Sequence, residues 1–74
     1  MKLQAVESSM IEAVGYDETT STLEVIFNRG KTYRYFEVPQ TVYLELMESD
    51  SKGSYMLADV IDCFPYEQVK KRRR

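Results

Sequence analysis

The sequence predicts an α+β fold: a three-stranded antiparallel β-meander followed by two helices packed on one sheet face. The chain has 74 residues, 43% of them hydrophobic and 30% charged, which suits one small folded domain. Segments rich in β-branched and aromatic residues precede Pro39, and the clearest of them alternates between apolar and polar positions as strands do. Beyond Pro39 the apolar residues recur every three or four positions, which is typical of helices.

Three strands are predicted, at residues 10–16, 22–27 and 31–37. Turn-forming residues 17–21 separate the first two strands, and residues 28–30 separate the second from the third. Residues 1–9 show no clear pattern, so we expect them to form an irregular entry to the sheet.

Two helices are predicted after the strands, at residues 40–48 and about 54–62. Pro39 suits the first turn of the first helix, because an N–H has no intrahelical partner there. The expected apolar face of that helix is Val42, Tyr43, Leu46 and Met47. The second helix is expected to end before Pro65 and to bury Leu57, Val60, Ile61 and Phe64.

The register of the second hairpin decides which side chains share a sheet face. A two-residue turn would place Arg34 opposite Val25, on the strongest apolar face. A three-residue turn places Gly30 at the left-handed position that such turns need, and it sets Glu24 opposite Arg34 as a favourable pair. We therefore expect the three-residue turn. The core face then carries Leu23, Val25, Phe27, Tyr33 and Tyr35.

The opposite sheet face is expected to stay uncovered, because two short helices cover only one face of so small a sheet. This face would keep an apolar patch among its charges. We expect the patch to consist of Val14, Tyr16, Ile26 and Phe36. Such a patch favours a protein–protein contact or a homodimer.

Composition excludes several functional classes. Without any histidine, the chain has no His-based acid–base catalysis and no Ser–His or Cys–His nucleophile pair. A single cysteine, Cys63, excludes an internal disulfide and a cysteine-built zinc site. We expect no enzyme activity, no cofactor and no metal. The first residues lack a secretion signal, and no apolar run is long enough to cross a membrane, so we expect a cytoplasmic protein.

Charge is distributed unevenly along the chain. The ten basic and twelve acidic residues give a net charge of −2, yet residues 1–69 hold only five of the basic residues and carry −7. The other five basic residues form the end of the chain: Lys70, Lys71, Arg72, Arg73 and Arg74. We therefore expect a single acidic domain at 1–69 and a basic disordered tail at 70–74.

Several short motifs occur in a characteristic order: Ser8-Ser9-Met10-Ile11, Gly15-Tyr16-Asp17, the strand 23–27, Tyr33-Arg34-Tyr35, Val38-Pro39 and residues 51–55. In this order and spacing the chain, over about residues 7–69, resembles the KTSC domain. That domain is named for its place at the C-terminus of some lysyl-tRNA synthetases, and it also occurs as a stand-alone bacterial or phage protein. The resemblance implies a role in RNA binding and no enzyme activity.

The candidate nucleic-acid site combines tyrosines that can stack unpaired bases with cations that can hold phosphate. Its residues are Arg29, Lys31, Tyr33, Arg34 and Tyr35, together with the tail residues 70–74. The alternative interpretation is structural: both tyrosines pack in the core, Arg34 pairs with Glu24, and the tail is merely solvated. Residues 51–54 are better explained as helix capping than as an anion site.

Overall fold

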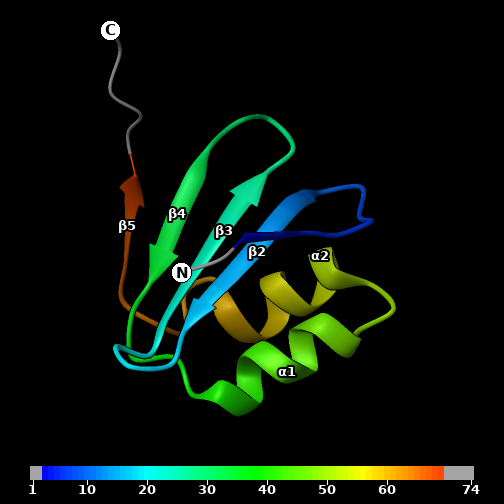
Figure 1. The fold of residues 1–74 in the computed structure, drawn as a ribbon. Helices are drawn as coiled ribbons and strands as arrows, with labels where there is room; N and C mark the ends of the chain where they lie inside the picture. The colour runs from blue at the N-terminus through cyan, green and yellow to red at the C-terminus, as the bar shows by residue number, and fades with distance from the viewer. Residues whose placement is uncertain (1–2, 70–74) are drawn as a thin grey trace, which may run out of the picture.

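The computed structural model describes residues 3–69, and Figure 1 shows their arrangement. Five strands form one antiparallel sheet in the order β1-β2-β3-β4-β5. The strands are β1 (Leu3–Ala5), β2 (Ile11–Asp17), β3 (Thr22–Phe27), β4 (Thr32–Tyr35) and β5 (Tyr66–Val69). The helical elements are α1 (Gln40–Glu48), α2 (Lys52–Tyr55) and a π-helical turn, η1 (Met56–Val60), that continues α2. The α+β class is confirmed.

The prediction of three strands is wrong, because a short strand pairs at each edge of the meander. β1 pairs with β2, where the expectation was an irregular entry, and β5 pairs with β4 after the helices. Both edge strands have three or four residues and are largely exposed, so neither shows alternating burial. A backbone hydrogen bond of 2.8 Å from Phe36 N–H to the Pro65 carbonyl holds the start of β5 beside the end of β4.

The register predicted for the second hairpin is confirmed. Leu23 pairs with Tyr35, Val25 with Tyr33 and Glu24 with Arg34. Gly30 has φ of +90°, and its N–H donates to the Phe27 carbonyl at 2.8 Å. Because L side chains are strained at such a φ, the glycine allows the three-residue turn to close.

The register of β2 corrects the predicted apolar patch. Val14 pairs with Val25 and Tyr16 pairs with Leu23, so both lie on the core face. Val14 is fully buried. Tyr16 stacks on Tyr43 of α1 with ring centroids 5.0 Å apart, and its hydroxyl donates to the Val38 carbonyl at 2.6 Å. The expectation that these two residues lie on the uncovered face is wrong, because the register of β2 against β3 points their side chains toward the helices.

The core lies between this face of the sheet and the helices. Leu46 of α1, Met56 and Val60 are fully buried against the strand residues. Helix α1 has the predicted bounds, although Pro39 precedes it instead of lying in its first turn. Val42, Tyr43 and Met47 pack against the core as predicted, as do Ile61 and Phe64.

The second helix differs most from its prediction. Leu57 is 63% exposed and Met56 is buried in its place. The Ile61 N–H donates to the Met56 carbonyl at 2.7 Å, which is the i to i+5 bond of a π-helical turn. This wider turn puts Met56 and Val60 on the buried side and rotates Leu57 outward.

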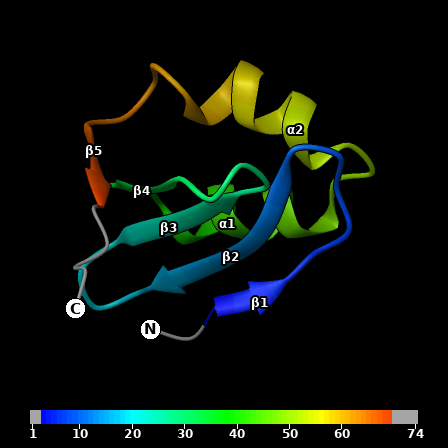
Figure 2. The same cartoon turned by 90° about the horizontal axis from the view of Figure 1, so that it is seen from above.

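The other sheet face carries no helix in the described part of the chain; Figure 2 shows α2 standing off one side of the strands. Ile26 and Phe36, both half-buried, remain from the predicted patch on this outer face. Within residues 3–69 no helix is long and apolar enough to span a bilayer.

Candidate functional site

Four aromatic rings gather on the helix side of the sheet, at the edge that the helices leave open. Tyr33 and Tyr35 are two residues apart in β4 and therefore share a face, and Tyr66 of β5 pairs with Tyr35. The centroid of the Tyr66 ring lies 5.8 Å from that of Tyr33 and 5.6 Å from that of Tyr35. Phe27 of β3 meets Tyr33 edge-on at 5.7 Å. The cluster forms because alternate residues of three neighbouring strands share one face.

This cluster lines a groove of about 490 Å³, which we call the aromatic groove. Its walls are Phe27, Tyr33, Tyr35 and Tyr66 from the strands, with Met10 before β2 and Ile61 after η1. Arg29 and Lys31 line it at the β3–β4 turn. A mainly apolar concave surface with a few charged groups is the usual form of a ligand site.

The four rings are unequally accessible. Tyr35 is 3% exposed and Tyr66 is 53% exposed, while Phe27 and Tyr33 lie between them. Tyr35 therefore packs in the core, as the structural interpretation predicts. Tyr66 offers most of its ring to solvent, and Tyr33 offers part of its own.

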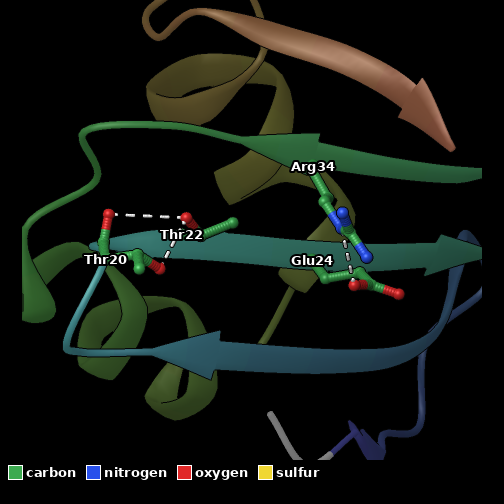
Figure 3. A network of polar contacts seen from close by, with 4 residues as sticks. All are labelled: Thr20, Thr22, Glu24 and Arg34. Carbon is green, nitrogen blue, oxygen red and sulfur yellow. Dashed lines mark hydrogen bonds and ion pairs between the residues drawn. The ribbon is translucent and has the colours of Figure 1, made fainter.

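Arg34, which the sequence grouped with this site, lies on the other sheet face. Its Nε donates to Glu24 Oε1 at 3.1 Å, and Figure 3 shows the two side chains meeting with the helices behind the sheet. Near them, Thr20 and Thr22 are joined through their hydroxyls at 2.9 Å. The structure thus brings Arg29, Lys31 and the tyrosines together and excludes Arg34 from their groove. The tail residues 70–74 lie outside the described residues.

Residues 51–54, Glu45 and Cys63 do not assemble into a site. Ser51 and Ser54 bond to each other through their hydroxyls at 3.0 Å. Glu45 accepts a hydrogen bond of 2.8 Å from the Tyr55 hydroxyl, which ties α1 to α2. Cys63 is exposed. Among residues 3–69, no three acidic or cysteine side chains are placed to hold a metal ion.

Tyr66 is the residue of the groove that sequence reasoning missed. It follows Pro65 and begins the four-residue segment Tyr66–Val69. The sequence signal for a strand there is that the two end residues, a tyrosine and a valine, are common in strands. So short a segment does not predict which strand it pairs with. Tyr66 reaches the groove only because β5 pairs with β4.

Burial raises the pKa of Tyr35 from 10.0 to about 12, and the charges of Tyr33, Tyr66 and Asp62 add to the effect. The folded state therefore favours the neutral phenol. We expect this stabilisation to be fully present below pH 10 and to be lost as the pH rises through 12. The free energy of unfolding, measured between pH 9 and about 12, checks this.

A Tyr35→Phe variant is the control for that titration, because it removes the titrating hydroxyl and keeps the ring. Its stability should fall less steeply above pH 10 than that of the parent chain. The pKa of Tyr55 is also raised to about 12, by desolvation first and by its bond to Glu45, so some alkaline loss should remain. Identical slopes for both chains would contradict the assignment to Tyr35.

The comparisons with known proteins point to one domain family. The sequence model of the KTSC domain matches residues 7–64. A lysine–tRNA ligase of Nostoc sp. is 44% identical over 63 residues, which are 85% of this chain and 11% of the ligase. A protein of Tsukamurella paurometabola is 44% identical over 54 residues, covering 73% of this chain and 81% of that protein. The chain thus spans only about a tenth of the ligases that it matches.

The fold also has a close solved counterpart. The crystal structure of a KTSC domain protein from Yersinia pestis superposes with a TM-score of 0.89 at 31% sequence identity. The match covers 93% of this chain and 97% of that one.

Proposed function

The chain belongs to the KTSC domain family, and we propose that it is a small non-catalytic binding domain whose aromatic groove holds unpaired RNA bases. The observation that carries the proposal is the groove itself, in which the rings of Tyr33 and Tyr66 lie beside the cations Arg29 and Lys31. Aromatic rings stack bases whatever their sequence, and nearby cations hold the phosphates. Lysine–tRNA ligases that carry a related segment provide a setting in which RNA is the substrate.

Arg29 and Lys31 are two of the few cations in an acidic domain. Residues 1–69 carry a net charge of −7, which repels phosphate at long range. Of the described cations, Arg34 is paired with Glu24, and the Lys52 ammonium donates to the Ser49 carbonyl at 3.0 Å. Arg29 and Lys31 flank Gly30 at the turn, where a phosphate beside the rings would meet both.

The test is a titration of the full chain with an unstructured single-stranded RNA over a salt series. Replacing both Arg29 and Lys31 with glutamine should lower the slope of log K against log salt by about 0.7, because the two cations hold one phosphate and each phosphate held on a single strand contributes about 0.7. Tyr66→Ala should lower affinity about tenfold, within the range for one lost base–aromatic stack.

Arg34→Gln is the matched control, since it removes a cation on the opposite sheet face. It should change neither the slope nor the affinity. Deleting residues 70–74 removes five further charges and should lower the slope separately, by up to about 3.5. If the Arg34 variant weakens binding as much as the groove variants do, or if the groove variants bind like the parent, the groove is not the RNA site.

A second candidate function is self-association or protein binding through the outer sheet face. The absence of a helix over this face in residues 3–69 supports it, and Ile26 and Phe36 are the apolar residues that it would use. The patch is smaller than expected, because Val14 and Tyr16 are in the core. Sedimentation that shows a dimer, lost on Ile26→Lys, is the result that this candidate requires.

A further inference from the structure

We infer that the aromatic groove receives one nucleoside monophosphate unit: a single unpaired base with one phosphate beside it. This inference rests on the proposed function and narrows its ligand. A free nucleotide and the terminal nucleotide of an RNA strand share this chemistry, whereas a nucleotide inside a strand has a phosphate on both sides.

The exposure of the rings limits the groove to one base. Tyr66 is 53% exposed, and Tyr35 is 3% exposed. Tyr33 is half-buried because Phe27 meets its ring from one side and Tyr66 from another. A base can therefore stack flat only on Tyr66, with its edge against Tyr33. A run of bases would need a row of open rings, which this cluster does not provide.

The charges along the groove admit phosphate at one end only. Arg29 and Lys31 line the end at the β3–β4 turn. Tyr35 follows Lys31 by four residues along the strand, a distance of about 13 Å. Asp62, which follows the groove residue Ile61 in the chain, is an exposed carboxylate whose charge helps to raise the pKa of the Tyr35 hydroxyl. A second phosphate at the Tyr35 end would meet a negative charge.

The size of the groove agrees with one nucleotide. A volume of about 490 Å³ lies in the range of sites for small molecules. A longer strand would have to leave the groove over a domain whose residues 1–69 carry −7. Charge complementarity thus favours a ligand with one phosphate at the turn and an uncharged group near Asp62.

The test uses the full chain and three probes in calorimetry at physiological salt: AMP, a linear oligoadenylate of twenty nucleotides, and the same oligonucleotide closed into a circle without ends. Each titration is repeated with Tyr66→Ala, with Lys31→Gln and with Arg34→Gln. Binding that the Tyr66 and Lys31 variants reduce and the Arg34 variant does not is binding in the groove. Lys31 lies at an exposed turn, so the Lys31 variant still tests binding in the groove if Tyr66→Ala disturbs β5.

We expect AMP to bind in the groove, to be weakened about tenfold or more by Tyr66→Ala, and to compete with the linear strand. The circle should show no binding that depends on Tyr66. Adenosine, which lacks the phosphate, should bind more weakly than AMP. If AMP binds in the groove while the linear strand does not, the ligand is the free nucleotide and the RNA proposal fails.

Equal groove binding by the circle and the linear strand would overturn the single-unit inference and leave the RNA proposal standing. Failure of AMP to compete with a linear strand bound in the groove would do the same. If no probe shows binding that depends on Tyr66 or Lys31, both the inference and the proposed function are wrong.

Discussion

Val14→Lys is expected to leave the domain largely unfolded at room temperature. Val14 is fully buried among the core residues between the sheet and the helices. Placing an ammonium there without a partner costs several kcal/mol, and a domain of 74 residues has a total stability of only about 3–5 kcal/mol. Far-UV circular dichroism and thermal melting measure the outcome.

Ile26→Lys is the matched control, because the same substitution falls on the neighbouring strand but on the outer face. Ile26 is half-buried and pairs with Thr32 and Ala13 there. A lysine at this position keeps its ammonium in water, so the melting temperature should fall only slightly. A cooperative melt for Val14→Lys at the temperature of the parent would contradict the placement of Val14 in the core.

Leu46→Ala is expected to lower the free energy of unfolding by about 2–5 kcal/mol, the usual cost of truncating a buried leucine. Leu46 is the one fully buried residue of α1, and it joins that helix to Met56, Val60 and the strands. Because helices of nine residues are not stable alone, α1 depends on this contact. Urea denaturation at constant pH gives the change in stability.

Leu44→Ala on the same helix is the comparison for that variant. Leu44 is 48% exposed, so its truncation should change stability by about 0.5 kcal/mol or less. The slope of the unfolding free energy against urea should be the same for both variants if the fold is retained. Equal losses at the two positions would show that α1 packs on a different face from the one described.

The sequence predicted the parts of the fold that depend on local chemistry. The register of the β3–β4 hairpin followed from Gly30 and from the pair of Glu24 with Arg34. The bounds of α1 followed from Pro39 and the spacing of its apolar residues. In both cases the deciding residues lie within about ten positions of one another, so the pattern contains the information.

The errors arose where pairing joins distant segments. The pleat of β2 is set by its pairing with β3 across a shift in register between Ile11 and Ala13, which no local pattern indicates. Likewise η1 rotated Leu57 outward by adding a residue to one helical turn. These features depend on how the helices and the sheet fill their shared core.

The candidate site divides in the same way. By itself the sequence determined that Tyr33 and Tyr35 share a face beside a turn with two cations, because alternation along one strand and a short turn are local properties. Only the tertiary structure decided that Tyr35 is buried, that Arg34 lies behind the sheet, and that Tyr66 completes the groove. Tyr66 lies more than thirty residues from Tyr33 in the chain. The two rings meet only because β5, which follows the helices in the chain, pairs with the edge of β4.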